Sequence, residues 1–594
     1  MTATGGGTDF DALLAANAQG AKREVKDAQP IHAALDLTSE RVKSGKVLSL
    51  LKRAVKTADE GDLPTAGRLT IKALDLDPEN PASNQVMGLI LERMNRLSQS
   101  IDFYERALNR DPGNADIYYN LGLVGWKLDM LEHAEKFFRV ALNIAPGGQD
   151  ATINLSGVLR DQGLYEDSIE ILRAATYADP TNAMYWNSIG TSVLEMGDPQ
   201  GALTFYQEAL RLSPDFARVW HNLGYAQTLI GDVEESTRSS DKALLNPKSG
   251  SDRAEMLYSR ALSLLASGEL ERGWDDYEIR LEADYKNATW FLTSAPRWDG
   301  RSPLKGQRLV MFGEQGIGDE VLFLNLAPDL IEEIGPEGEL TIACEKRLAP
   351  LVARSFLKAR VIPHATKKQE GRAFRGAPGI QDWNEVDLWC AMATPNLILR
   401  RKVEDFPSGP DAKGHFKPDP DRVAAMRAAL DELPAGLKVG LCWKSKLMTA
   451  KRSKYFSPFE DWRSVLKTPG AVFVSLQYGE VDEEIAQAAK DYGVTIHQIP
   501  GLDLMNDLDG VAALGAALDL SMGPLNASTN LAGAVGGEVW FTALTSNWPL
   551  HGTTRVPAYP RARAFCPSVY GQWAEPLKTM AAELAQKIEA RKAA

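Results

Sequence analysis

Apolar and small side chains recur with a fixed period along residues 47–281. Five prolines mark this period, because they stand 34 residues apart in an unbroken series. Small residues occupy the same three positions between successive prolines, and this spacing predicts two closely packed helices in each period. The five prolines are Pro78, Pro112, Pro146, Pro180 and Pro214.

This pattern is similar to that of the tetratricopeptide repeat family. Six repeats run from about Val47 to about Gly250, and a divergent seventh reaches about Leu281. Arrays of this kind bind other chains and rarely carry chemistry, so the resemblance implies an all-α solenoid at residues 47–284 that holds a protein partner. The first small position of the repeat is filled by Gly88, Gly122, Ser156, Gly190 and Gly224.

A ladder of polar residues occupies the sixth position of four repeats, on the helix expected to line the inside of the array. An amide side chain offers both a donor and an acceptor, so such a ladder can clamp the backbone of an extended peptide. The alternative is that asparagine is simply common at this position in such repeats. The predicted client-binding residues are Asn120, Asn154, Ser188 and Asn222.

Beyond the array the pattern changes to alternating strands and helices. "QRLVMFGEQGIGDEVLF" predicts a short apolar strand, a glycine-rich turn and an amphipathic helix. A second series opens with "GLKVGLCWKS" and ends in "LAGAVGGEVWFTAL". Alternation of this kind favours parallel sheets, so we expect two Rossmann-like lobes that face a cleft, at residues 285–415 and 416–594.

Composition and charge limit the number of domains, the partners and the location that we expect for the protein. The 594 residues are 44% hydrophobic, which is enough for two or three domains. A net charge of −13 argues against a nucleic-acid partner, because binding phosphate needs a basic face. The first twenty residues lack the features of a secretory signal, and no apolar run is long enough for a membrane span, so we expect a cytoplasmic protein. Residues 1–46 predict a partly helical tail.

The α/β half carries a further resemblance. "PRWDGRSPLKGQRLVMFGEQGIGDEVLF" and "ALDLSMGPLNASTNLAGAVGGEVW" are similar to bacterial tetratricopeptide proteins with a GT-B glycosyltransferase domain, and most of all to the flagellin glycosyltransferases of stalked alphaproteobacteria. The resemblance covers about residues 47–580. It implies a metal-independent GT-B enzyme whose array captures flagellin. It further implies transfer of a nonulosonic acid of the pseudaminic acid type to Ser or Thr, with no cofactor besides the nucleotide-sugar.

Glycosyl transfer to a hydroxyl needs a base for the acceptor proton. In "GEQGIGDEVL" the glycines Gly316 and Gly318 permit a tight turn whose backbone can approach a substrate, and Asp319 matches the Gly-Asp motif of the family. Asp319 is therefore the candidate base, with Glu314 and Glu320 as substitutes. The alternative role for Asp319 is to cap the helix that follows.

The nucleotide-sugar is expected against the second lobe. "GPLNASTNLAGA" places hydroxyl and amide side chains at a helix start, where free N–H groups suit a phosphate, although an ordinary capped helix has the same pattern. Many relatives carry Asp-Thr and then His here; this chain has Leu525, Asn526 and Asn530, which fits a single-phosphate CMP-sugar or a weakened enzyme. The predicted donor-binding residues are Gly316, Gly318, Lys444, Lys446, Arg452, Gln477, Asn526, Ser528, Thr529 and Asn530.

Two other functions remain open at this point. The first is a non-catalytic adaptor or chaperone, in which the array binds a client and a degenerate α/β domain supports it. The second is a transferase for a surface polysaccharide, in which the repeats organise an assembly. No metal is expected in any of these cases, because the four Asp-x-Asp strings lie in the tail, a repeat, a linker and a helix start.

Overall fold

The computed structural model describes residues 45–369, 372–409, 412–445 and 455–593. These residues form two compact units. The first contains the described chain up to Met196 with Arg211–Ser213, and the second contains Gly197–Leu210 and the chain from Pro214 onward. The division therefore falls inside the predicted array. Of the predicted tail, only residues 45 and 46 are described, and they begin the first helix.

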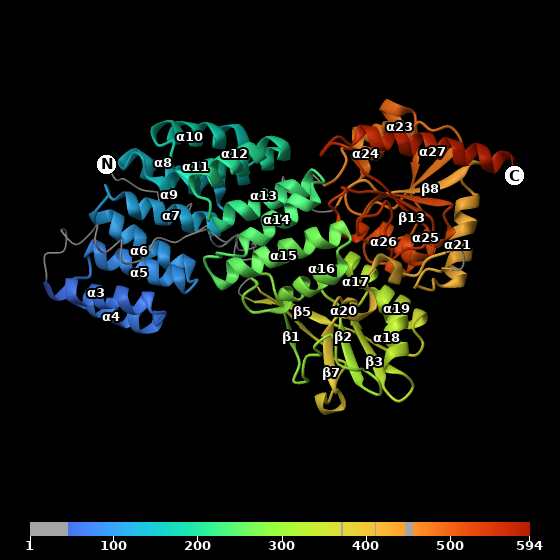
Figure 1. Cartoon of the computed structure of the whole chain (residues 1–594), viewed down its shortest axis with the longest axis horizontal. Helices are drawn as coiled ribbons and strands as arrows, with labels where there is room; N and C mark the ends of the chain where they lie inside the picture. Colours follow the sequence, from blue (N-terminus) through green and yellow to red (C-terminus); the bar gives the residue numbers. More distant parts are fainter. Residues whose placement is uncertain (1–44, 370–371, 410–411, 446–454, 594) are drawn as a thin grey trace, which may run out of the picture. The chain divides into compact units, whose positions relative to one another are not determined.

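The first unit is an array of helices joined by short turns, drawn in blue and teal in Figure 1. The small residues predicted inside each repeat sit at helix crossings. A Cβ on Gly88 would lie 2.6 Å from the ring of Tyr104, and one on Gly122 would lie 2.7 Å from the ring of Phe138. The all-α array is confirmed. Its helices here are α3 (Gly45–Asp59), α4 (Leu63–Leu76), α5 (Pro81–Arg93), α6 (Leu97–Arg110), α7 (Ala115–Lys127), α8 (Leu131–Ile144), α9 (Gln149–Asp161), α10 (Tyr165–Ala178) and α11 (Ala183–Met196).

The last repeat is built into the α/β half of the second unit. Trp274 is buried and lies edge-to-face with Trp548, at a centroid distance of 5.8 Å, and with Phe323 at 6.3 Å. Its indole Nε1–H donates to the carbonyl of Arg400 at 2.9 Å. One hydrophobic core thus joins the end of the array to both parallel sheets. The helices that continue the array are α12 (Pro199–Leu212), α13 (Ala217–Leu229), α14 (Val233–Ala243), α15 (Gly250–Ser267), α16 (Leu270–Tyr277) and the 3₁₀ turn η2 (Glu278–Leu281).

The first sheet of the α/β half is parallel, with the strand order β4-β3-β2-β7. From β2 the chain adds β3 and β4 on one side, and it then returns to add β7 on the other side of β2. Because ligands bind at such a reversal in open α/β sheets, the turn after β2 is the natural place for a site. The strands are β2 (Arg308–Phe312), β3 (Glu339–Cys344), β4 (Arg360–Pro363) and β7 (Leu388–Ala391). The helices around them are α17 (Ile317–Phe323), η3 (Leu324–Leu326), α18 (Ala327–Ile334), α19 (Ala349–Ser355), η4 (Trp383–Glu385), α20 (Asn396–Leu399) and η5 (Val403–Asp405).

A small third sheet accompanies the first and was not predicted. It has the order β1-β6-β5, with β1 (Thr289–Leu292) parallel and β5 (Ala365–Gln369) antiparallel to β6 (Arg372–Gly376). Its inner face carries Phe291, which packs on Phe312 and Trp389 of the larger sheet. All five residues of β5 are exposed and mostly polar, so this strand has no apolar alternation to reveal it in the sequence.

The second large sheet is parallel throughout, in the order β10-β9-β8-β11-β12-β13. Numbered from β8, this is the doubly wound order 3-2-1-4-5-6, and its reversal lies between β8 and β11. The strands are β8 (Leu437–Leu441), β9 (Ala471–Ser475), β10 (Ile496–His497), β11 (Leu520–Pro524), β12 (Val539–Thr542) and β13 (Ala562–Phe565). The helices are α21 (Pro420–Asp431), η6 (Phe459–Trp462), α23 (Arg463–Leu466), α24 (Asp482–Gln487), η7 (Ala488–Tyr492), α25 (Leu508–Ala517), α26 (Ala527–Ala534), η8 (Trp548–Leu550) and α27 (Ala574–Ala593).

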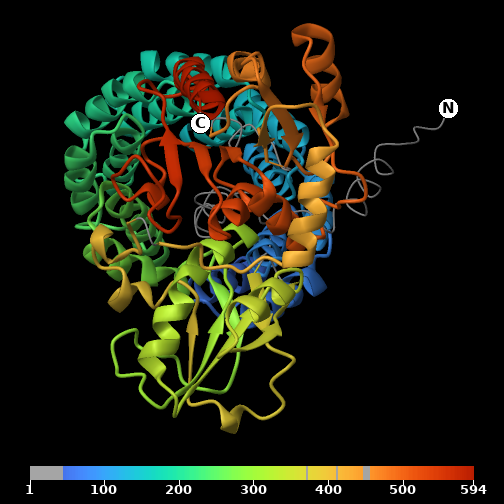
Figure 2. The ribbon, with the colours of Figure 1, turned by 90° about the vertical axis from the view of Figure 1, so that its right-hand side faces the viewer.

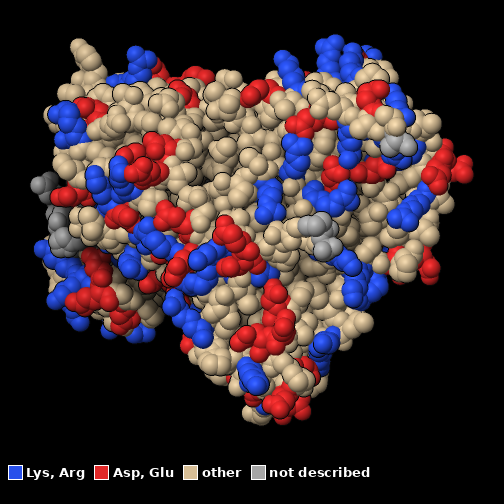
Figure 3. All heavy atoms as spheres, turned by 45° about the vertical axis from the view of Figure 1, so that its right-hand side comes forward, with Lys and Arg blue, Asp and Glu red and all other residues tan. Residues whose placement is uncertain are grey.

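The last helix packs against this sheet. Helix α27, red in Figure 2, buries Leu577, Met580 and Leu584 in a core that also contains Trp540 and Phe565 of the sheet. On the face drawn in Figure 3, basic and acidic side chains are intermixed. Within the described ranges, none of the helices has the length and apolar character needed to cross a bilayer.

The helix crossing at Gly122 gives a test of the array. Gly122→Ala places a methyl group against the ring of Phe138, so we expect a loss of about 1–3 kcal/mol in the free energy of unfolding. Gly67→Ala is the matched control, because its Cβ meets nothing within 4 Å in helix α4 and alanine favours a helix by up to about 1 kcal/mol. Urea unfolding of both variants measures the difference. Equal stability of the two would contradict the close crossing.

Candidate functional site

The glycine-rich turn between β2 and α17 is held from two sides. Gln315, at its apex, has a positive φ of 56°, a conformation that few residues other than glycine adopt. Its side-chain Nε2 donates to the hydroxyl of Tyr277 in α16 at 2.5 Å. Its carbonyl accepts from Nη2 of Arg375 in β6 at 2.6 Å. The end of the array and the small sheet therefore fix the shape of this turn together.

Asp319 lies on the first turn of α17 and is half-buried. Its carboxylate accepts a hydrogen bond from the Gly316 N–H at 3.1 Å, so it does cap the helix as one interpretation of the sequence expected. Burial, and then the charges of Glu314 and Glu320, raise the pKa of Asp319 to about 6. A carboxylate with this pKa is half-protonated at about pH 6 and mostly ionised at neutral pH, which suits a general base as well as a cap.

Glu314 is engaged inside the fold. It is 2% exposed, and its carboxylate accepts from Nε of Arg280 at 2.7 Å and from Nη2 of the same residue at 3.0 Å. The backbone N–H of Ala393, just after β7, donates to it at 2.7 Å. These contacts give Glu314 a structural partner on every side, and they leave little of its carboxylate to accept a proton from a substrate.

Glu320 is engaged in the same way on the other side of the turn. It is 2% exposed and accepts from the Glu345 N–H at 2.8 Å and forms a hydrogen bond with Nε2 of His364 at 2.9 Å. Its carboxyl group fills the space beside Gly313, where a Cβ would lie 2.5 Å away. Among the three carboxylates predicted as candidates, Asp319 is thus the one with exposed surface.

The start of α26 meets the start of α17. The amide Nδ2 of Asn530 donates to the carbonyl of Gly318 at 3.1 Å, and a Cβ on Gly318 would lie 3.3 Å from this nitrogen. The two segments that the sequence assigned to base and donor therefore lie side by side. Asn526 caps α26 by accepting from the Thr529 N–H at 3.2 Å, and Ser528 and Thr529 are buried at the same helix start.

Gln477 has a structural role that the sequence did not reveal. Its Oε1 accepts from the backbone N–H groups of Trp443 and Lys444 at 2.9 and 2.8 Å, and its Nε2 donates to the Tyr478 carbonyl at 3.0 Å. It is 2% exposed, so its amide shapes the turn after β8 and has little surface for a nucleotide. Lys444 pairs with Glu484, while the predicted donor residues Lys446 and Arg452 lie outside the described residues.

The predicted client ladder is largely buried. Asn120 is 1% exposed, and Asn154 and Ser188 are each 6% exposed, while Asn222 is half-buried. The Nδ2 of Asn154 donates to the hydroxyl of Tyr119 in the preceding repeat at 2.9 Å. The amide of Asn154 therefore joins two repeats, and this position offers little polar surface to a guest.

Arg375 is a residue that the sequence analysis missed. Besides its bond to Gln315, its Nη1 lies 3.6 Å from Oε1 of Glu320. Its Nε and Nη1 are buried and make no hydrogen bond with any described residue. No sequence motif predicts the role of Arg375. It lies beside the turn because β6 is the central strand of the small sheet, with β1 on one side and β5 on the other.

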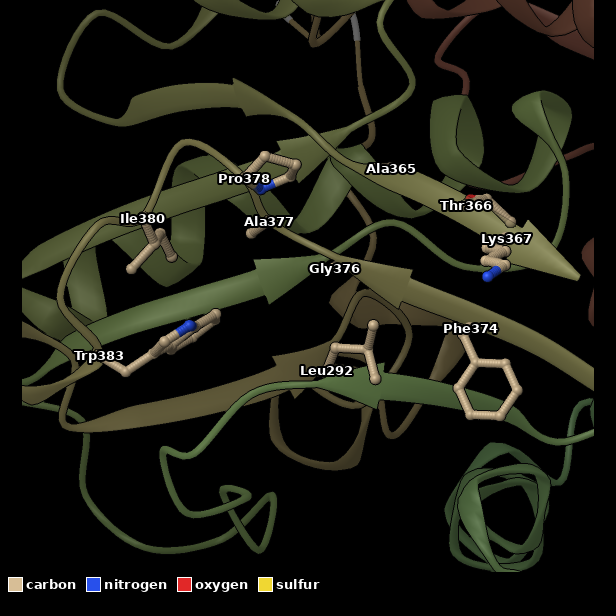
Figure 4. A pocket seen from close by; sticks show the side chains of 10 residues that line it. All are labelled: Leu292, Ala365, Thr366, Lys367, Phe374, Gly376, Ala377, Pro378, Ile380 and Trp383. Atoms are coloured by element: carbon tan, nitrogen blue, oxygen red, sulfur yellow. The ribbon is translucent and has the colours of Figure 1, made fainter. Parts of the chain in front are cut away.

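The outer face of the same small sheet carries an apolar cavity of about 370 Å³. Figure 4 shows Leu292 and Phe374 on adjacent strands, with Trp383 and Ile380 toward one end and Lys367 toward the other. Side chains alternate across a strand, so this cavity and Arg375 lie on opposite faces of the sheet. No group of three or more His, Cys, Asp or Glu side chains is placed to hold a metal ion in the described part of the chain.

Comparison with known proteins finds tetratricopeptide repeats in the first half of the chain. Models of the tetratricopeptide repeat match residues 88–129, 115–147 and 187–252. The chain is also similar to protein FlbA of Caulobacter vibrioides, with 45% identity over 344 residues. That match covers 58% of this chain and spans 57% of the length of FlbA.

Two solved structures are similar to part of this chain. A tetratricopeptide repeat protein from Parabacteroides merdae covers 40% of this chain and 92% of its own, with 17% identity and a TM-score of 0.35. PilF of Pseudomonas aeruginosa covers 38% of this chain and 98% of its own, with 15% identity and a TM-score of 0.30.

The raised pKa of Asp319 predicts a pH-dependent stability difference. Because its pKa lies above the usual 3.8, the folded protein binds the proton more tightly than the unfolded chain does. The wild type therefore loses stability as the pH rises from about 4 to about 6, and Asp319→Asn does not. Two units of pKa correspond to about 3 kcal/mol. Urea unfolding at pH 4 and pH 7.5 measures this, and a difference between variant and wild type that does not change with pH would contradict it.

Proposed function

We propose that the protein is a cytoplasmic protein O-glycosyltransferase of the GT-B type. Its array captures flagellin, and its α/β half transfers a nonulosonic acid of the pseudaminic acid type from a CMP-sugar to Ser or Thr. The observation that carries the proposal is the meeting of the two helix starts, α17 with Asp319 and α26 with Asn530, at the reversal points of two doubly wound sheets. Ligands bind at such points. The acceptor and the sugar rest on the family resemblance.

The chemistry follows from this arrangement. The Asp319 carboxylate takes the proton from the acceptor hydroxyl, whose oxygen forms a bond to the anomeric carbon of the sugar. The bond from that carbon to the phosphate oxygen breaks, and CMP departs with the electron pair. Backbone N–H groups at the start of α26, which Asn526 orders by capping, are suited to the phosphate. Asp319 must be ionised before the transfer begins, so that it can accept the proton.

A second candidate function is a client-binding adaptor without turnover. The engagement of Gln477, Asn526 and Thr529 in bonds within the protein favours it, because these side chains were expected to hold the donor. The adaptor would bind flagellin through the array and leave its mass unchanged. The two functions are separated by one measurement on the client.

Intact mass of flagellin is that measurement. Purified flagellin is incubated with CMP-pseudaminic acid and the full-length protein, and we expect mass increments of one sugar residue. Asp319→Asn should abolish them because its amide cannot take the proton. Asp482→Asn is the control, since it makes the same change at an exposed position on α24. Increments with Asp319→Asn would exclude Asp319 as the base, and none with the wild type would favour the adaptor.

The pH profile of transfer gives a further prediction. With a pKa of about 6 for Asp319, the ionised fraction rises about tenfold per pH unit below that value and then levels off. We expect kcat/KM to follow this curve between pH 4.5 and 8. A rate that is flat across pH 6 would mean that another group limits the reaction. Asp482→Asn should retain the wild-type profile.

A further inference from the structure

A second cavity lies where the array ends and the glycine-rich turn begins. Its volume is about 120 Å³. Tyr258 of α15 and Tyr285 form its wall, with ring centroids 4.8 Å apart. Asn287, Thr289 and Gln315 also line it. Its walls thus come from three separate stretches of the chain, one of which is the turn that carries the candidate base.

The charged groups that line this cavity are engaged with other groups of the protein. Arg280 and Glu314 are joined by the two hydrogen bonds already described, and Arg280 also donates to Glu278 at 2.6 Å, so two carboxylates share one guanidinium. A phosphate or a carboxylate would find its guanidinium already occupied. Hydroxyl and amide groups supply the remaining polarity, so the cavity favours a neutral polar ligand.

The volume of the cavity further limits the ligands that it can hold. Sites for drug-sized molecules measure about 300–1,000 Å³, several times the volume available here. The cavity has room for one small side chain rather than for a nucleotide or a whole sugar. A small, neutral and polar group on a larger molecule fits these limits, and among such side chains Ser and Thr are the acceptors of the proposed function.

The cavity is also close to Asp319. Gln315, which lines the cavity, directly precedes Gly316, whose N–H donates to the Asp319 carboxylate at 3.1 Å. The charge of Asp319 also acts in the same direction as the larger effect of burial, which raises the pKa of Tyr258 and of Tyr277. Tyr277 in turn binds Gln315. The cavity is therefore lined by the same turn whose Gly316 N–H binds the candidate base.

We propose that this cavity is an acceptor subsite, which holds a Ser or Thr side chain of the client polypeptide. This assignment rests on the proposed function. Under it, the cavity is the place where a client bound by the array reaches the α/β half. It predicts that the subsite contributes to binding of the acceptor and not of the nucleotide-sugar.

Filling the cavity tests the assignment. Asn287 is exposed at its edge, so Asn287→Trp obstructs the space without disturbing a core. With flagellin and CMP-pseudaminic acid as substrates, we expect the KM for flagellin to rise about tenfold and the KM for the CMP-sugar to stay within about twofold. Ala283→Trp is the control, because it adds the same ring to an exposed position nearby that does not line the cavity. An unchanged KM for flagellin in Asn287→Trp would overturn the proposal while leaving the transferase function intact.

A crosslinking experiment tests whether the client occupies the same subsite, and it does not require turnover. Benzoylphenylalanine is placed at position 287 or at position 283 of the full-length protein, which is then mixed with flagellin and irradiated. Crosslinks from position 287 to a Ser- or Thr-containing segment, absent from position 283, support the subsite even if no sugar is transferred. Equal crosslinking from both positions, or none from position 287, overturns it.

Discussion

The buried ion pair between Arg280 and Glu314 is the contact on which the α/β half depends. Arg280 ends the last repeat, and Glu314 follows β2 directly. Replacing either residue alone would leave the other charge buried without a partner, which costs about 3–5 kcal/mol, so each of the two segments constrains the residue on the other. The Ala393 N–H adds the end of β7 to the same point. The pair lies beside the hydrophobic core that the last repeat shares with both parallel sheets, and all of these residues belong to the second compact unit.

The pair also explains how three carboxylates within seven residues take different roles. Glu314 binds toward the array, and Glu320 binds toward β3, β4 and the small sheet through Glu345, His364 and Arg375. Both are therefore part of the support of the turn. Asp319 lies between them, and their charges add to the effect of burial on its pKa. The surrounding charge that raises the pKa of Asp319 is thus the same charge that holds its loop.

The sequence predicts the parts of this molecule that depend on local pattern. The period of the repeats, the parallel sheets and the helix after the glycine-rich turn all follow from spacing and from runs of apolar residues. Gln477 and Arg375 show where that reasoning ends. Gln477 binds backbone groups 33 and 34 residues away, and Arg375 reaches a carbonyl 60 residues away. Contacts of this range depend on strand order, which no local pattern contains.

Under the proposed function, Asn530 bears on which part of the nucleotide-sugar would lie where α17 and α26 meet. Its Nδ2 is used on Gly318, while its Oδ1 is buried without a hydrogen bond to any described residue. An unsatisfied buried acceptor costs about 1–3 kcal/mol, a cost that a ligand can offset only with a donor. A phosphate offers acceptors alone at neutral pH, so it is a poor match for this atom. A hydroxyl or amide N–H of the sugar would match it, so the proposed transferase would hold the phosphate on the backbone N–H groups of α26 and the sugar on the side facing α17.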